Sequence, residues 1–173
     1  RVWFTPRTPN VQMISLTEND RLLGMLPPFH SFGLTGNLLL SVCGGLPTVF
    51  HANPTEGAML AKLVEAYRVS MIVGTPTFLS GVARAGSPAQ LASLRLAFTG
   101  AEECPARVWR LLKERCANAV IVEGYGITEC SPVVAVNPMD EPVPGTIGKL
   151  MASLEGAVVD LELTRRLPAG ETG

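Results

Sequence analysis

Short apolar runs alternate with longer stretches of helical periodicity along most of the chain. The runs are rich in β-branched and other large apolar residues, as buried strands require. The pattern predicts five strands: Leu22–Leu26, Pro47–Phe50, Met71–Gly74, Leu94–Thr99 and Ala119–Val122.

Between these strands, apolar residues recur at the spacing of a helix, and proline stands early in several of the stretches. We expect four helices, over residues 33–42, 54–67, 76–83 and 105–116. Strand, helix and strand at this spacing imply right-handed crossovers and a parallel sheet that is covered on both faces.

From Ser131 onward the helical spacing stops, and VVAV, GTIGKL and AVVDLELT read as short strands. The expected fold class is therefore α/β, a mostly parallel sheet with helices on both faces, followed by a short β-rich tail. We divide the chain into a lead-in segment over 1–20, an α/β subdomain over 21–130 and the tail over 131–173. Because the chain opens at Arg1 and stops in the turn LPAGETG, we expect a piece of a longer protein.

Composition excludes several classes of protein. Of the 173 residues, 47% are hydrophobic and 17% charged, which is typical of a packed globular chain. The formal net charge is −1 and Lys and Arg form no cluster, so we expect no nucleic-acid partner. The apolar stretch LLLSVCGGL is short and broken by glycines, which argues against a membrane span. We expect a cytoplasmic protein. For the longer parent protein, a location at the inner face of the cell membrane stays an open alternative.

Cysteine and histidine form no metal-ligand pattern. The four cysteines lack CxxC spacing and the two histidines are not paired, so free thiols in a reducing compartment are expected. Cys130 stands beside a glycine-rich motif, but no histidine is near it in sequence to activate a nucleophile.

Polar and glycine-rich segments follow four of the predicted strands. They read PPFHSFG, GTPTF, TGAEECP and EGYGITE. In open α/β sheets, ligands bind outside the carboxyl ends of the strands, so these segments are expected to meet in one crevice.

The segment GYGITE fits a dinucleotide fingerprint poorly. Glu129 stands where the third glycine should be, and Pro132 interrupts the helix that should hold the pyrophosphate. A simple glycine turn with Tyr125 in the core would leave Thr128 and Glu129 unexplained. A chemical interpretation accounts for all of them: an aromatic ring that stacks on a purine, a hydroxyl that donates to phosphate, and a carboxylate that holds Mg²⁺.

Three segments together resemble one family. EGYGITECSP is similar to the adenine-and-phosphate segment of the adenylate-forming superfamily, which includes acyl-CoA synthetases, peptide-synthetase adenylation domains and luciferases. LPPFHSFGLT resembles its acyl-site segment, and TGAEECP the loop that borders the adenine. The resemblance covers about residues 21 to 173 and points to the fatty-acyl branch. It is strongest to the acyl-carrier-protein synthetase half of bacterial lysophospholipid acyltransferase/acyl-ACP synthetase proteins.

The resemblance implies a role for individual residues. Tyr125 would stack on adenine, Thr128 would contact the α-phosphate and Glu129 would bind Mg²⁺. His30 would lie at the carboxylate end of the acyl pocket, although an ordinary loop histidine remains open. The other implied nucleotide residues are Gly100, Ala101, Glu102, Gly124 and Gly126. The other implied acyl-pocket residues are Phe32, Gly33, Thr75 and Phe78, with core packing open for the two phenylalanines.

The resemblance also implies a function. The parent would be an ATP-dependent fatty-acid ligase that uses Mg²⁺, forms acyl-AMP and transfers the acyl group to the thiol of CoA or acyl-carrier protein. Nothing in RVWFTPRTPN resembles the family's lysine-ending phosphate loop. We therefore expect the 173 residues alone to be inactive, to depend on the remaining parts of the parent, and to self-associate. The alternatives are a non-catalytic nucleotide-binding or regulatory module and a degenerate relative kept for protein interaction.

Overall fold

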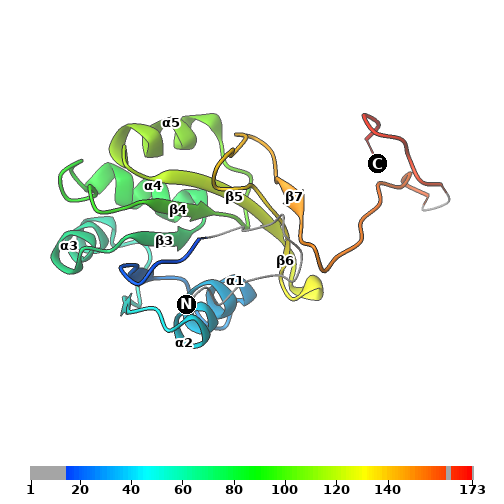
Figure 1. Ribbon diagram of the computed structural model, residues 1–173. Coiled ribbons are helices and arrows are strands. Elements are labelled where there is room, and N and C mark those ends of the chain that lie inside the picture. The colour runs from blue at the N-terminus through cyan, green and yellow to red at the C-terminus, as the bar shows by residue number, and fades with distance from the viewer. Residues whose placement is uncertain (1–14, 163–164, 173) are drawn as a thin grey trace.

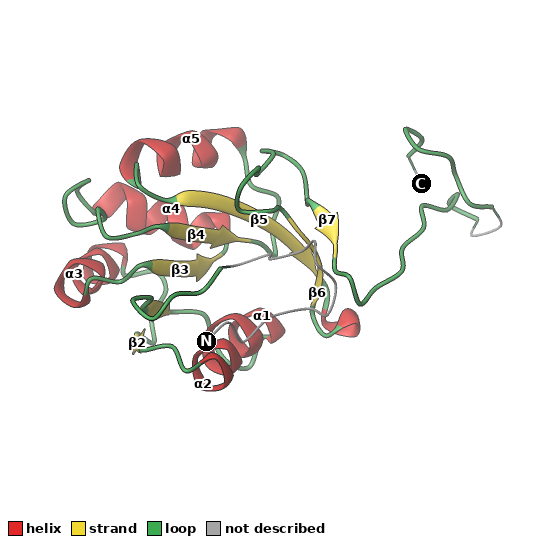
Figure 2. Ribbon diagram, in the orientation of Figure 1, coloured by secondary structure: helices red, strands yellow, loops and turns green. Residues whose placement is uncertain are grey.

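The fold is a seven-stranded sheet flanked by helices, in a computed structural model that describes residues 15–162 and 165–172 (Figures 1 and 2). Most of the predicted lead-in segment lies outside the described residues. The strands are ordered β2-β1-β3-β4-β5-β6-β7. Neighbours from β2 to β5 run parallel, and β6 and β7 are added antiparallel. The predicted α/β class with a mostly parallel sheet is confirmed.

All five predicted strands are present, with ends that differ by a few residues. The strands are β1 Leu22–Gly24, β2 Thr48–Phe50, β3 Met71–Gly74, β4 Leu96–Thr99, β5 Val120–Gly126, β6 Val133–Val136 and β7 Lys149–Leu150. The largest difference is in β5, which was predicted to end at Val122 and continues through Gly126.

The predicted helices are present as well. The first is one continuous helical run made of α1 Ser31–Gly33, the π-helical segment η1 Leu34–Leu39 and α2 Leu40–Gly44. The others are α3 Gly57–Tyr67, α4 Pro76–Ala85 and α5 Ala106–Arg115. Helix α3 starts later than predicted because Asn53 Oδ1 accepts hydrogen bonds from the backbone N–H and the hydroxyl of Thr55, which holds 53–56 as a turn.

The central strands of the sheet, β1, β3 and β4, are buried on both faces. Consecutive strand residues alternate between two apolar clusters, so that Leu22 and Leu96 face one side while Leu23 and Ala97 face the other. Helices α3, α4 and α5 cover the larger cluster, and the helical run from Ser31 to Gly44 covers the smaller one (Figure 1). Strands with two buried faces read as continuous apolar runs, which is why the sequence pattern identifies them.

The tail is less regular than predicted. Of its three expected strands, VVAV forms β6 and GTIGKL is reduced to the two residues of β7. AVVDLELT forms no strand among its described residues, only a bridge between Val159 and Arg166. Val158 and Leu161 are exposed there, and the part of the tail that follows β7 extends away from the sheet (Figure 1). Apolar alternation alone does not make a strand when no neighbouring strand is available to pair with it.

The amino ends of three parallel strands are held together by one buried carboxylate. Asp20, 1% exposed, lies just before β1 and forms a bidentate ion pair with Arg95, which precedes β4. The hydroxyl of Ser70, before β3, donates to Asp20 at 2.7 Å, and the backbone N–H of Thr17 donates to it at 2.7 Å. This cluster is not apparent from the sequence, because its members are far apart along the chain.

None of the helices in the described part of the chain is long and apolar enough to span a membrane.

Candidate functional site

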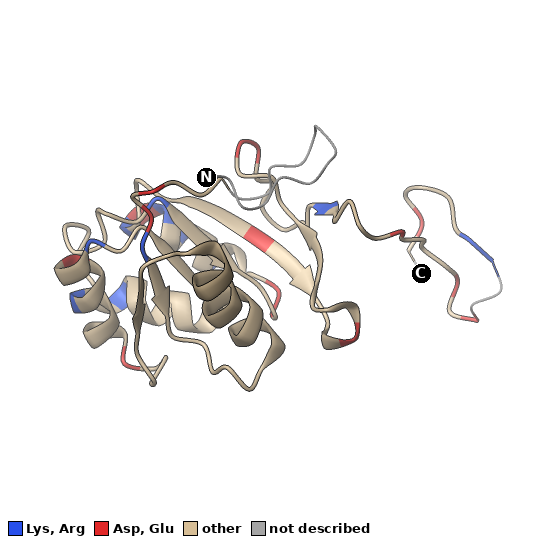
Figure 3. Ribbon diagram, turned by 60° about the horizontal axis from the view of Figure 1, so that its bottom comes forward, with Lys and Arg blue, Asp and Glu red and all other residues tan. Residues whose placement is uncertain are grey.

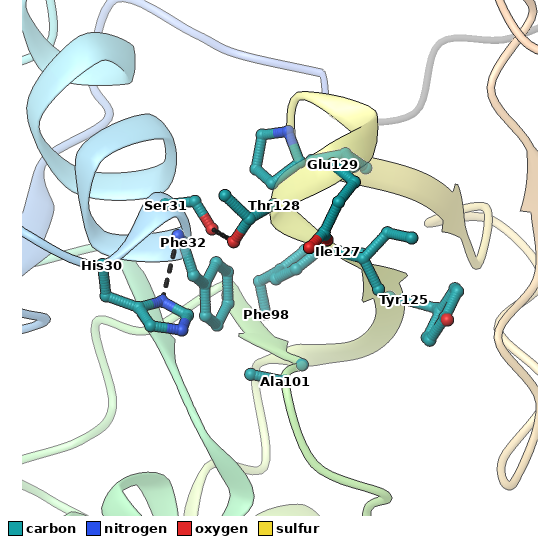
Figure 4. Close-up of a pocket in the computed structure, with 14 residues that line it drawn as sticks. His30, Ser31, Phe32, Phe98, Ala101, Tyr125, Ile127, Thr128 and Glu129 are labelled. Carbon is teal, nitrogen blue, oxygen red and sulfur yellow. Dashed lines mark hydrogen bonds between the residues drawn. The ribbon is translucent and has the colours of Figure 1, made fainter.

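A cavity of about 300 Å³ opens at the carboxyl ends of β4 and β5 (Figure 4). The start of α1 and the short 3₁₀ turn η2, Thr128–Cys130, form its other walls. Three of the four predicted edge segments meet there, and GTPTF does not. The predicted site residues that line the cavity are His30, Phe32, Gly100, Ala101, Gly124, Tyr125, Gly126, Thr128 and Glu129.

Four predicted site residues lie outside the cavity lining and have structural contacts. The Thr75 hydroxyl caps α4 by accepting from the N–H of Phe78, and Phe78 packs against both apolar clusters. Gly33 is buried, and a Cβ there would lie 2.1 Å from the carbonyl oxygen of Pro27. Glu102 is exposed and accepts a hydrogen bond from the Thr77 hydroxyl at 2.9 Å.

The GYG motif is part of a hairpin and not a turn before a helix. Tyr125 pairs with Ala135 of β6, and a bulge follows between Tyr125 and Gly126. The Ile127 N–H donates to the carbonyl of Pro132 at 2.8 Å and closes the loop. A Cβ on Gly126 would lie 2.3 Å from that same carbonyl oxygen, so only glycine fits. The strand–turn–helix of a dinucleotide fingerprint is therefore not formed here.

Aromatic rings and glycines form the inner wall of the cavity. The rings of Phe32 and Phe98 lie 6.0 Å apart and are tilted by 57°. A Cβ on Gly124 would lie 2.6 Å from the Phe98 ring, and one on Gly100 would lie 2.9 Å from the Gly124 carbonyl oxygen. The glycines thus let the ends of β4 and β5 approach each other closely. Tyr125 is 44% exposed, so its ring is available to a ligand.

The polar side of the cavity is formed by three side chains from two segments (Figure 4). His30 Nδ1 accepts a hydrogen bond from the Phe32 N–H at 3.2 Å, so the proton of the neutral ring resides on Nε2. The hydroxyls of Ser31 and Thr128 lie 3.0 Å apart. Ser31 was not among the predicted site residues, because its partner is 97 residues away in the sequence.

Charge in the cavity comes from one carboxylate. Glu129 is the only Asp or Glu among the described residues that line it, and none of those residues is Lys or Arg. In Figure 4 its carboxylate turns back toward the space beside Thr128 and Ile127. A phosphate group could approach this carboxylate only with a cation between them.

The described residues contain no cluster of three or more His, Cys, Asp or Glu side chains that could hold a metal ion by themselves. Mg²⁺ is commonly bound by one or two carboxylates and completes its octahedral shell with phosphate oxygens and water. Glu129 therefore fits the role of the single protein carboxylate in a site where phosphate and water supply the other ligands of Mg²⁺.

A second carboxylate, Glu123, supports the site from within β5, where Figure 3 shows one acidic position inside the strand. It is 6% exposed and accepts a hydrogen bond from the Cys104 N–H at 2.9 Å, which ties β5 to the loop that follows β4. Ala101 in that loop has a left-handed backbone, with φ at 66°. Glu123 was not among the predicted site residues, although a charged residue next to an apolar strand is a signal for a buried partner.

The thiols are free, as expected, and two of them are chemically inert. Burial, and secondarily the Glu123 carboxylate, raises the pKa of Cys104 to about 11. Burial raises the pKa of Cys116 to about 11 as well. Both thiols are protonated at neutral pH and are therefore poor nucleophiles.

Comparison with known proteins identifies the family. A family model described as "AMP-binding enzyme" matches residues 4–173. The chain belongs to the AMP-binding enzyme family.

Individual members of the AMP-binding enzyme family agree in sequence and fold. The chain is 32% identical to a probable 4-coumarate–CoA ligase of Dictyostelium discoideum, over 98% of this chain and 31% of that protein. It is also 32% identical to a long-chain-fatty-acid–CoA ligase of Escherichia coli, over 86% of this chain and 27% of that protein. The structure of an anthranilate CoA ligase in complex with anthranoyl-AMP superposes with a TM-score of 0.80 at 27% identity, over 92% of this chain and 31% of that one. The chain thus spans about a third of the length of these family members.

Proposed function

We propose that this chain is part of an ATP-dependent acid–thiol ligase, which activates a carboxylate as acyl-AMP and then transfers the acyl group to a thiol. The observation that carries the proposal is one cavity that combines an exposed aromatic, Tyr125, a hydroxyl pair and a lone carboxylate, Glu129, in a member of the AMP-binding enzyme family. Relatives named as CoA ligases, one of them solved with an acyl-AMP, support it.

The residues of the cavity suit the activation step. Tyr125 would stack on the adenine of ATP and Thr128 would donate its hydroxyl to the α-phosphate. Mg²⁺, when bound at Glu129, would neutralise charge on the phosphate oxygens. His30, whose Nε2–H is available, would donate to the carboxylate substrate at the edge formed by α1. The thiol acceptor would be CoA or an acyl-carrier protein.

The substrate is expected to be a carboxylate without an ammonium group, and an aliphatic acid in particular. An amino acid would bring a positive charge, which is costly to bury without an acidic partner. The stretches HSFGLTGNLLL and GTPTFLSGV contain no Asp or Glu. Glu129 would already be engaged by Mg²⁺.

Pyrophosphate exchange by the full-length protein tests the proposed function and the substrate class together. We expect exchange with a panel of fatty acids from C8 to C18 and none with leucine or phenylalanine. 4-Coumarate, an aromatic acid without an ammonium group, tests whether the site prefers aliphatic over aromatic carboxylates. Exchange driven by the amino acids alone would refute the substrate class. If the protein bound AMP but catalysed no exchange, the result would support the alternative of a non-catalytic nucleotide-binding module.

The aromatic role predicts a loss of nucleotide affinity in Tyr125→Ala. Stacking of a base on an aromatic side chain contributes about 1–3 kcal/mol, so AMP should bind roughly 5- to 150-fold more weakly. Because Tyr125 is half exposed, the fold should remain intact, and Tyr125→Phe should restore most of the affinity. Isothermal titration with AMP, paired with circular dichroism, measures both. If the alanine variant and the wild type bound AMP with equal affinity, Tyr125 would not stack on the nucleotide and would have only a packing role.

The 173 residues alone are proposed to be inactive and to self-associate. Their described cavity residues offer hydroxyls and one imidazole to a triphosphate but no Lys or Arg. Val42 and Phe50 are 72% and 58% exposed, and β2 forms one edge of the sheet. Such apolar surface and an open strand edge favour association between copies.

A further inference from the structure

We propose that Ser31 is a positioning residue that acts through Thr128. It would hold the Thr128 hydroxyl in the orientation that donates to a phosphoryl group of the bound nucleotide. This assignment rests on the proposed function and concerns the same cavity. Its basis is the 3.0 Å contact between the two hydroxyl oxygens, across the gap between α1 and η2 (Figure 4).

Each hydroxyl belongs to a segment that has its own hydrogen bonds to the rest of the fold, so the contact does not depend on two unanchored loops. Ser31 begins the helical run 31–44, which is fixed below the sheet edge by a hydrogen bond from the Leu26 N–H to the buried side chain of Asn37. Thr128 begins η2, a turn closed by the hydrogen bond from the Ser131 N–H to the Thr128 carbonyl. The hydroxyls are thus brought together by two independently anchored elements.

The usual structural role of serine at the start of a helix is already filled. His30 is the N-cap, and its Nδ1 accepts the Phe32 N–H that a capping hydroxyl would otherwise bind. The Ser31 hydroxyl is consequently not used as a cap. The contact that the structure gives it is Thr128.

The chemistry of two hydroxyls fixes the direction of the hydrogen bond when an anion is present. A hydroxyl has one proton to donate and two lone pairs that accept. If Ser31 donates to Thr128 Oγ1, the Thr128 proton is free to point at a phosphoryl oxygen. In the reverse direction Thr128 would donate its only proton to Ser31, and only its oxygen lone pairs would face the anion. A bound phosphate therefore selects the first arrangement, in which the chain of two hydrogen bonds is mutually polarised.

The contribution should be measurable because donors are scarce in this cavity. Among the described lining residues, no Lys or Arg is present to dominate the binding of phosphate. Loss of one ordinary hydrogen bond corresponds to about a threefold to tenfold effect.

The test is a double-mutant cycle in the full-length protein, followed by fatty-acid-dependent pyrophosphate exchange. Ser31→Ala is expected to lower kcat about threefold to tenfold, with little change in the KM for the fatty acid or in the melting temperature. Ser31→Thr, which keeps a hydroxyl, should restore the rate. Thr128→Val should cost more than Ser31→Ala, and adding Ser31→Ala to it should cost almost nothing further, because Ser31 acts through Thr128.

Ser93→Ala is the matched control. It also removes a half-buried hydroxyl that makes one hydrogen bond, at 2.8 Å to the Val69 carbonyl, but it is not part of the cavity lining. It should leave exchange unchanged. A Ser31→Ala enzyme as active as the wild type, or a fully additive double variant, would overturn the Ser31 assignment while the proposed function stands. A wild-type protein without exchange would overturn the proposed function, and the assignment with it.

Discussion

Glu129→Gln is expected to lower the rate of pyrophosphate exchange by about 10²–10³-fold, the usual effect of removing one electrostatic stabiliser from an active site. Glutamine keeps the shape of the side chain and removes the charge that Mg²⁺ requires. Since no second Asp or Glu lines the cavity within the described residues, no neighbour can take over that charge. Fatty-acid affinity should change little.

A Mg²⁺ titration of the exchange reaction separates a metal ligand from a residue that only shapes the cavity. The variant should need a higher Mg²⁺ concentration to reach half of its maximal rate. Glu103→Gln is the matched control, because Glu103 is an exposed acid in the loop after β4 that does not line the cavity. An unchanged rate and an unchanged Mg²⁺ dependence in Glu129→Gln would remove Glu129 from the metal site.

The fold could be predicted to the extent that it depends on local burial. The central parallel strands β1, β3 and β4 have two buried faces, and their apolar runs are visible without any knowledge of partners. The end of β5 was misplaced because Glu123 breaks the apolar run. In the structure that carboxylate is satisfied by the N–H of Cys104, which is 19 residues away, and the strand continues beyond it. The third tail strand was predicted from alternation, yet its described residues find only a single bridge.

The candidate site was predictable where its residues share a motif. Tyr125, Thr128 and Glu129 lie in one segment, and the structure brings that segment together with His30 and Gly100 at one sheet edge. Ser31 could not be identified, since its significance comes from a partner distant in sequence. Thr75 was predicted to line the acyl pocket; it follows β3 at the same edge, but it lies outside the cavity lining and its hydroxyl caps α4. Topology indicates which strand ends meet, whereas the direction of each side chain depends on packing.

At the opposite edge of the sheet, Asp20→Ala is expected to lower the free energy of unfolding by about 3 kcal/mol. This is the lower end of the cost of breaking a buried ion pair, because the Arg95 side chain that is left behind is 31% exposed and can be hydrated. Arg95 would lose both of its bonds to the carboxylate, and the hydroxyl of Ser70 would lose its 2.7 Å bond and keep only the 3.4 Å contact with the Arg21 carbonyl. Urea unfolding of the 173-residue chain at low concentration, followed by circular dichroism, measures the difference. Ser93→Ala, which also lies near the amino end of the sheet, should cost only about 1 kcal/mol as a matched loss of one hydrogen bond.

The same carboxylate predicts how stability depends on pH. Burial by itself would raise the pKa of Asp20, but hydrogen bonds from Arg95, Ser70 and Thr17 outweigh it and lower the pKa to about 2. Because the folded pKa lies below the unfolded value of 3.8, the folded state gains stability from ionised Asp20 above about pH 4 and loses it as pH falls toward 2. The difference in unfolding free energy between wild type and Asp20→Asn should therefore be constant from pH 7 to pH 5 and shrink between pH 4 and pH 2. A difference that stayed constant through pH 2.5 would mean that the ionised carboxylate is not what Arg95 and Ser70 stabilise.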